Sequence, residues 1–222
     1  MAKPFKLDFT KAALLIVDVQ NDFMPWGSLP VPHGDTIVPV IQRLFQLPFK
    51  AKIAVRDWHP REHCSFASRW NKAVGESIKL NGVTQKLWPD HCVQGSWGAD
   101  FAPGIQELPF DRRFEKGNDH DIDSYSAFFN AQKATSTGVE AFLVEREIST
   151  VVLAGLTFEY CVYTSALHAL ELGHTVYLAH DGIQAIDELS KLTKDRIREM
   201  IDRGAKVIES GSLLDLQLQV MG

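Results

Sequence analysis

A cysteine stands at the boundary between a predicted buried strand and a predicted helix. The run Val151-Val152-Leu153-Ala154 is apolar and ends at Gly155, and apolar residues at helical spacing follow as far as Gly173. This pattern predicts a strand over 151–154 and a helix that begins near Cys161. A thiol there meets the positive end of the helix dipole and unpaired N–H groups, which favour its thiolate and can hold an oxyanion. Cys161 is therefore a candidate nucleophile, and the competing interpretation is a small buried core cysteine.

Two further polar residues stand at the ends of predicted strands. Asp18 lies near the end of the apolar run from Ala12 to Val19, and Lys116 closes a short strand that begins at Arg112. In a parallel sheet, ligands bind at the carboxyl ends of the strands, which makes both residues candidates for a ligand site. The competing interpretations are a turn or cap residue for Asp18 and an exposed surface side chain for Lys116.

A predicted strand over 52–55 runs into the segment Arg56-Asp57-Trp58-His59-Pro60. In an extended chain Asp57 and His59 point to the same side, because side chains repeat every two residues. An aspartate with two histidines is a plausible ligand set for zinc, manganese or iron(II). The Asp-x-His pair alone is a weak signal, and His63 and His91 are the candidates to complete the set.

The elements that carry these residues alternate between strand and helix. Helical spacing occurs over 36–47, 138–148 and 187–203, and further short apolar strands are predicted over 175–179 and 206–208. This alternation predicts an α/β fold of three α/β/α layers around a doubly wound, mostly parallel sheet. We find no repeat or linker, so we expect a single domain over residues 1–222. The polar stretch at about 61–100 is expected to be a long loop that covers the strand ends.

Three expectations concern burial. Trp70 and Trp97 are expected to form a local core under the covering loop, and the apolar segment 213–220 to pack on the body or on another subunit. In the helix over 187–203, the residues expected to face inward are Leu189, Leu192, Ile197, Met200 and Ile201.

Composition excludes several classes of protein. The 222 residues are 45% apolar with a net charge of −5, and charges of one sign do not run in blocks, so we expect neither nucleic acid nor a membrane as partner. No apolar run approaches the length of a membrane span. The start of the chain lacks the apolar core of a signal peptide, and the three cysteines are an odd number, which together predict a reducing, cytoplasmic location.

The polar strand-end residues fall in blocks that resemble the isochorismatase-like hydrolase superfamily and, within it, the nicotinamidases. The Asp, Lys and Cys blocks are marks of the superfamily, and the Trp-Pro-x-His block together with the Asp-x-His pair is the narrower mark of the nicotinamidases. The matching blocks, in the family's order, are Asp18–Phe23, Asp57–Pro60, Trp88–Gly95, Phe114–Gly117, Asp123–Phe128 and Gly155–Val162.

The resemblance implies a metal-assisted cysteine hydrolase that converts nicotinamide and water into nicotinate and ammonia through a thioester, as a step of NAD salvage. It implies a catalytic triad of Asp18, Lys116 and Cys161, with the oxyanion held by the backbone N–H groups of Thr157 and Cys161. The nicotinamide ring would lie between Phe23 and Trp88, with Tyr125 near the pocket.

The resemblance also implies one divalent metal ion, zinc in first place and iron or manganese as alternatives, held by Asp57, His59 and His91. In some relatives a further ligand comes from the place that His63 holds, and in others water fills it. The implied partners are therefore a small molecule, nicotinamide, and further copies of the chain in a homo-oligomer.

One departure from the family pattern concerns the residues after Gly155-Leu156. Many relatives carry Ala and then a small or polar residue, where this chain has Thr157-Phe158-Glu159. The family places a cis peptide bond just before the Thr157 position, so loop detail and substrate fit are where this chain is expected to differ. The rival functions are an N-carbamoyl amidase, an isochorismatase, a catalytically silent binding protein and a thiol redox protein.

Overall fold

The computed structural model describes residues 7–80 and 82–221, and of the last helix it describes the side chains as far as residue 216. Six strands of this part of the chain form one sheet, and every neighbouring pair in it is parallel. Their order across the sheet is β5 (Arg112–Lys116), β2 (Ala51–Asp57), β1 (Ala12–Val17), β6 (Thr150–Gly155), β7 (Thr175–Ile183) and β8 (Lys206–Ile208).

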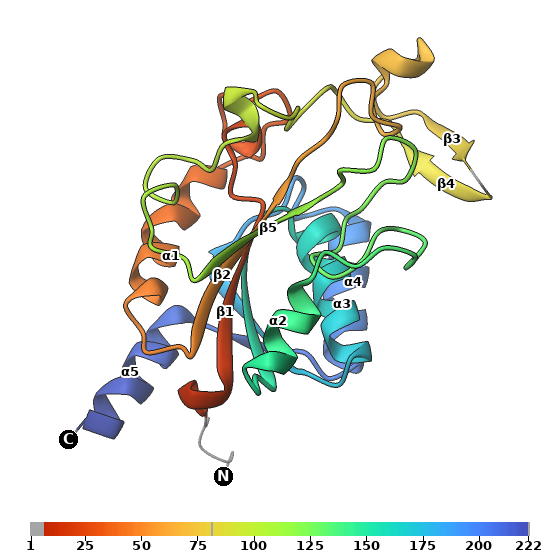
Figure 1. Ribbon diagram of the computed structural model, residues 1–222. Coiled ribbons are helices and arrows are strands. Elements are labelled where there is room, and N and C mark those ends of the chain that lie inside the picture. Colours follow the sequence, from red (N-terminus) through yellow and green to blue (C-terminus); the bar gives the residue numbers. More distant parts are fainter. Residues whose placement is uncertain (1–6, 81, 222) are drawn as a thin grey trace.

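Helices cover both faces of this sheet, which confirms the predicted α/β/α layers (Figure 1). On one face lie α1 (Val38–Phe45) and α5 (Ser210–Met221), and on the other lie α2 (Val139–Glu145), α3 (Tyr163–Glu171) and α4 (Lys191–Asp202). Strand β1 shows why the sequence requires two covering layers. All six of its residues are buried, and successive side chains enter opposite cores, Leu14 and Ile16 one, Leu15 and Val17 the other.

The topology brings the polar strand ends to one edge. From β1 the chain continues outward to β2 and β5 on one side, while β6, β7 and β8 follow on the other, so the strand order reverses between β1 and β6. Register places Val17 beside both Val55 and Gly155, and Asp57 beside Lys116. The carboxyl ends of β1, β2, β5 and β6 are thus adjacent at the position where open α/β sheets bind ligands.

The segment expected to be a loop over 61–100 contains a β-hairpin. Strands β3 (Ser77–Leu80) and β4 (Val83–Lys86) pair antiparallel in it and lie away from the main sheet (Figure 1). The sequence carries a signal for this hairpin that the prediction missed, since the pair Asn-Gly at 81–82 between short alternating runs is typical of a two-residue turn.

Several burial predictions were wrong. Trp97 is 60% exposed, whereas Trp70 is half-buried and donates its indole N–H to the Cys64 carbonyl. Of the residues expected to face inward from the last predicted helix, only Met200 is buried, and the exposed ones are Leu189, Leu192, Ile197 and Ile201. The physical reason is that α4 packs beside α3, and a groove of about 800 Å³ remains between part of its apolar face and strands β7 and β8.

Two further observations complete the fold. Leu213 in α5 is fully buried in the core beside α1, so the tail packs on the body at this point, while the side chains from residue 217 onward lie outside those described. Among the described residues, no helix is both long enough and apolar enough to cross a membrane.

Candidate active site

The nucleophile candidate lies in a sharp turn between β6 and α3. Gly155 ends the strand with φ of 128°, and a Cβ there would come within 2.0 Å of the Val17 carbonyl oxygen, so this position requires glycine. The next peptide bond, Leu156–Thr157, is cis, as the resemblance implies. A single π-helical turn, Phe158–Val162, then leads directly into α3 and carries Cys161, whose side chain is 5% exposed.

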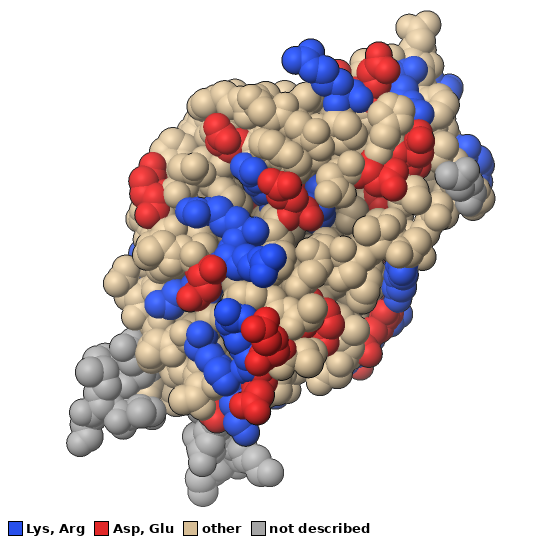
Figure 2. Space-filling model, in the orientation of Figure 1, with Lys and Arg blue, Asp and Glu red and all other residues tan. Residues whose placement is uncertain are grey.

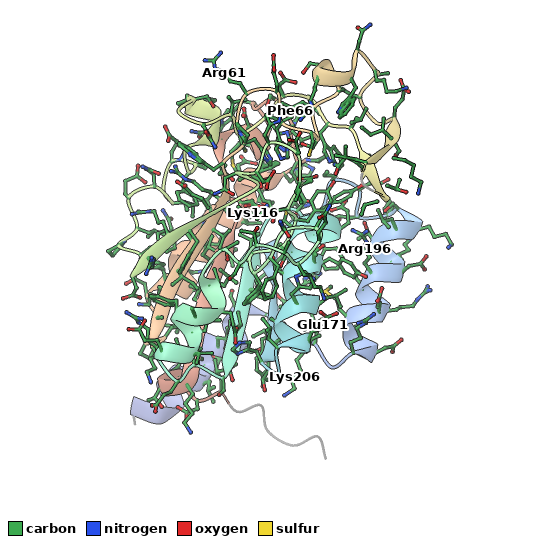
Figure 3. The ribbon with its side chains drawn as sticks, turned by 45° about the vertical axis from the view of Figure 1, so that its right-hand side comes forward. Arg61, Phe66, Lys116, Glu171, Arg196 and Lys206 are labelled. Carbon is green, nitrogen blue, oxygen red and sulfur yellow. The ribbon has the colours of Figure 1, made fainter. Side chains whose placement is uncertain are left out.

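Lys116 joins the groups that the strand ends bring together (Figure 3). Its Nζ lies 2.9 Å from Asp18 Oδ2 and 3.3 Å from Cys161 Sγ, and it donates a hydrogen bond of 2.5 Å to Asp57 Oδ1. Asp18 sits one residue past β1 in a left-handed conformation, with φ of 52°. Asp18 and Lys116 are at most 1% exposed, so this cluster is closed to bulk water.

Burial of this cluster favours a protonated thiol at rest. Burial raises the pKa of Cys161 well above its usual range, and the cation of Lys116 only partly offsets this. Burial also raises the pKa of Asp18, to about 7, although the same cation opposes it. Burial lowers the pKa of Lys116, but Asp18 and Asp57 outweigh it and hold the pKa above the usual range. The sequence-based expectation of a resting thiolate is therefore not supported, and ionisation of Cys161 requires a base, for which Asp18 is suitably placed.

A candidate metal site lies beside this cluster. Its ligand atoms, which lie within 4.8 Å of one another, come from Asp57, His59 and His91. The Nδ1 atoms of His59 and His91 each lie 2.8 Å from a backbone carbonyl, that of Gly117 and that of Pro89 respectively. In the neutral rings those Nδ1 atoms carry the hydrogen, so each Nε2 keeps a free lone pair. His59 Nε2 lies 3.7 Å from Asp57 Oδ2, so an N,N,O donor set faces one point, as a divalent ion requires.

His63 lies beside this set, against the ring of His59. Its ring stacks on that of His59 with centroids 4.1 Å apart, and its Nδ1 lies 2.8 Å from Ser65 Oγ. With His59 and Asp123 it forms a second group whose ligand atoms lie within 4.8 Å of one another. Burial and the neighbouring His59 lower the pKa of His63 to about 3, so the ring is neutral.

A small pocket opens above Cys161. Phe23 and Trp88 are both in its lining, and the indole of Trp88 donates a 2.9 Å hydrogen bond to the Tyr125 hydroxyl. The pocket is lined by Phe23, Leu29, Asp57, Trp88, His91, Tyr125, Thr157, Tyr160, Cys161 and Ile186.

Sequence reasoning missed three of these lining residues. Tyr160 immediately precedes the nucleophile candidate and packs edge-on against Trp88 at 4.9 Å, so its position next to Cys161 could have pointed to it. Leu29 and Ile186 come from irregular segments without periodicity, and no pattern in the sequence marks them.

Comparison with known proteins identifies the family of the chain. The model of the isochorismatase domain matches residues 12–212. The chain therefore belongs to the isochorismatase family.

Within that family, similar proteins include nicotinamidases. The Escherichia coli nicotinamidase is 39% identical over 87% of this chain and 92% of its own length. The structure of the Acinetobacter baumanii nicotinamidase pyrazinamidase superposes with a TM-score of 0.87 at 38% identity, over 92% of this chain and 98% of that one. The pyrazinamidase of Pyrococcus horikoshii, solved in complex with zinc, has a TM-score of 0.73 at 34% identity, over 90% of this chain and 99% of that one.

Proposed function

We propose that this protein hydrolyses nicotinamide to nicotinate and ammonia. The observation that carries the proposal is the position of Lys116, which contacts the nucleophile Cys161 at 3.3 Å, the base Asp18 at 2.9 Å and the metal-ligand candidate Asp57 at 2.5 Å. Cys161 and Asp57 of this cluster line an aromatic pocket, and the chain is 39% identical to a nicotinamidase. The implied physiological role is NAD salvage.

The first half of the reaction forms a thioester. Asp18 takes the proton of the Cys161 thiol, and Sγ attacks the carboxamide carbon, so the C=O electron pair moves onto oxygen. The backbone N–H groups of Thr157 and Cys161 hold that oxyanion, and each such donor contributes about 3 kcal/mol. When the oxyanion collapses, the C–N bond breaks, and Asp18 returns its proton to the nitrogen that leaves as ammonia.

The second half hydrolyses the thioester. Asp18, again ionised, removes a proton from water as the water oxygen attacks the thioester carbon. The C–S bond breaks, Asp18 returns the proton to Sγ, and the product leaves as nicotinate after its carboxyl group loses the second water proton to solvent. Lys116 stays positive throughout, because its pKa is held above the usual range, and it stabilises negative charge on Asp18 and on Sγ.

We infer that one divalent metal ion, in first place zinc, binds Asp57, His59 and His91. The two free Nε2 lone pairs and the Asp57 carboxylate fit such an ion, and the related pyrazinamidase of Pyrococcus horikoshii was solved with zinc. When bound, the ion supplies positive charge that can polarise water or hold the pyridine nitrogen. His63 is the proposed additional ligand through its Nε2, because only its Nδ1 is engaged by Ser65, and otherwise water completes the set.

The pocket explains how the ring would be held. Phe23 and Trp88 provide apolar faces on which a flat pyridine can stack. Tyr125 fixes the indole of Trp88 through its hydroxyl, so it positions the pocket wall.

We further propose that the chain forms one domain, lies in the cytoplasm and assembles into homo-oligomers. The sheet spans residues 12–208, and all three cysteines are free thiols. Lysine and arginine side chains intermix with acidic ones on the face in Figure 2, which supports a small molecule rather than a polyanion as ligand.

The groove beside α4 supports self-association with a second copy of the chain. It exposes a group of large apolar side chains, Leu189, Ile197, Ile201 and Val207. Its lining also carries Asp181, Glu188 and Glu209. Light scattering of the protein and of Ile197→Asp tests this, and equal masses for both would contradict it.

Ammonia release by the purified protein tests the function. With zinc present, nicotinamide is expected to release ammonia and an N-carbamoyl amine is not. Chelation is expected to abolish release, and returned zinc to restore it. Release from the N-carbamoyl compound alone would replace the proposed substrate, and activity that resists thorough chelation would contradict the metal proposal. Peroxide reactivity of Cys161 without any amidase activity would favour the thiol redox alternative.

A further inference from the structure

Thr157 carries a buried hydroxyl that has no partner. The residue is 4% exposed, it lines the same pocket as Cys161, and its Oγ1 makes no hydrogen bond within the described residues. It is the one hydroxyl among the buried orphaned side-chain atoms of the described chain. Other buried hydroxyls nearby are satisfied, since Ser165 Oγ accepts from the Ala127 N–H at 2.8 Å and Ser126 Oγ from the Phe128 N–H at 3.0 Å.

An orphaned hydroxyl at this position points to a missing ligand. Burying a hydroxyl without a partner costs free energy, so such groups are rare in native proteins and mark a bound molecule or a catalytic role. Because Thr157 lines the pocket, a substrate bound there can reach it.

The backbone fixes Thr157 so that its amide and hydroxyl are available together. Its carbonyl oxygen accepts from the N–H groups of Tyr160 at 3.2 Å and Val162 at 3.1 Å, which ties the residue to the π-helical turn. Its own N–H has no acceptor in hydrogen-bond geometry among the described residues. The N and Oγ1 atoms of one threonine are separated by only two carbons, so both can donate to a single oxygen.

We propose that the Thr157 hydroxyl is a third donor to the oxyanion, alongside the backbone N–H groups of Thr157 and Cys161. This inference rests on the proposed amide hydrolysis and deepens it. As Cys161 Sγ bonds to the carboxamide carbon, negative charge develops on the oxygen, and the Thr157 O–H donates to that oxygen. The hydroxyl keeps its proton, and it stabilises the transition state more than the ground state because the negative charge on that oxygen grows as the S–C bond forms.

The competing role for this hydroxyl is a hydrogen bond to the amide nitrogen. An aldehyde analogue, pyridine-3-carbaldehyde, distinguishes the two roles because it has no nitrogen at that position. The Cys161 thiol adds to its carbonyl: an S–C bond forms, the C=O π pair moves onto oxygen, and the thiol proton goes to Asp18 or to that oxygen. The adduct presents an oxyanion-like oxygen to Thr157 without any amide group.

The test compares Thr157→Val and Thr157→Ser with the unmodified protein. We expect Thr157→Val to lower kcat about 10- to 100-fold with KM changed less than about threefold, and to weaken aldehyde binding by a similar factor. Thr157→Ser keeps the hydroxyl and is expected to stay within about threefold of the unmodified protein in both measurements.

Thr164→Val is the matched control. Thr164 Oγ1 donates to the Tyr160 carbonyl at 2.8 Å, so this variant also removes a hydroxyl beside the π-helical turn, but outside the pocket. It is expected to leave aldehyde affinity unchanged, which separates loss of the oxyanion donor from loosening of the turn.

Three results would overturn the inference. The first is unchanged kcat and aldehyde affinity in Thr157→Val. The second is a loss of kcat and aldehyde affinity in Thr157→Ser equal to that in Thr157→Val. The third is a loss of kcat in Thr157→Val with full aldehyde affinity, which would assign the hydroxyl to the amide nitrogen. Failure of the proposed function gives a different pattern. In that case nicotinamide releases no ammonia even with the unmodified protein, while the aldehyde still binds in a manner that depends on the Thr157 hydroxyl.

Discussion

Replacement of Lys116 by methionine tests the buried charge cluster. Methionine keeps the length of the side chain but removes the cation, and it leaves the carboxylates of Asp18 and Asp57 within 4.8 Å of each other. At an effective dielectric constant of about 20, the attraction between unit charges 2.9 Å apart is about 6 kcal/mol, and the cost of desolvating the lysine opposes it. We therefore expect the free energy of unfolding to fall by about 3–5 kcal/mol, which is typical when one partner of a buried ion pair is removed.

Loss of the cation also acts on the base. The Lys116 charge lowers the pKa of Asp18 against the effect of burial, so its removal raises that pKa further above about 7. Asp18 is then protonated at neutral pH and cannot accept the Cys161 proton. We therefore expect Lys116→Met to lose at least about 10³-fold in kcat/KM as well as stability.

Urea unfolding and steady-state ammonia release measure the two effects. Lys133→Met is the control, because the ion pair from Lys133 to Glu171 has the same length, 2.5 Å, as that from Lys116 to Asp57. The Lys133 side chain is 52% exposed, and exposed ion pairs contribute only about 0–1 kcal/mol to stability. Lys116→Met with a stability loss below about 1 kcal/mol and activity within tenfold would refute the reasoning.

Three further predictions follow from the same structure. Cys161→Ala is expected to abolish ammonia release while nicotinamide still binds by calorimetry, and turnover by this variant would contradict its role as nucleophile. Because Asp18 must be ionised to act as base and burial raises its pKa to about 7, kcat/KM is expected to fall about tenfold per pH unit below that value, whereas an acid limb near pH 4 would show an unperturbed carboxyl. Leu15→Ala is expected to cost about 2–5 kcal/mol in urea unfolding, because Leu15 is fully buried in the core beneath α2 and α3, and a loss below 1 kcal/mol would mean that the site collapses around the cavity.

The sheet and the polar strand ends could be predicted because local pattern determines them. A fully apolar run such as β1 must be buried on both faces, and a polar residue at its carboxyl end then lies at the ligand-binding edge. Asp18 follows this rule, Asp57 and Lys116 also stand at the carboxyl ends of their strands, and Cys161 lies in the turn after β6. The structure brings these side chains together. The ion pair from Lys116 to Asp57, which links the proposed triad to the proposed metal set, needs the register of β2 and β5 and is not visible in sequence.

The failures lie where burial depends on distant elements. An amphipathic pattern shows which face of α4 is apolar, but not that the sheet ends at β8 and leaves Ile197 and Ile201 over an open groove. The pocket wall at Ile186 also comes from tertiary contacts, because the buried carboxylate of Glu159 accepts the N–H groups of Ile186 and Asp187 and fixes that loop. The orphaned Oγ1 of Thr157 likewise appears only when all its neighbours are in place.

Rapid quenching of the zinc-loaded protein during turnover of nicotinamide, followed by mass spectrometry of the peptide that contains Cys161, tests the central claim most directly. We expect that peptide to carry a nicotinoyl group in thioester linkage, to lose it as nicotinate accumulates, and to remain unmodified in Asp18→Asn. Nicotinate production with an unmodified Cys161 at every time point, while a control thioester survives the same quench and digestion, would contradict the account.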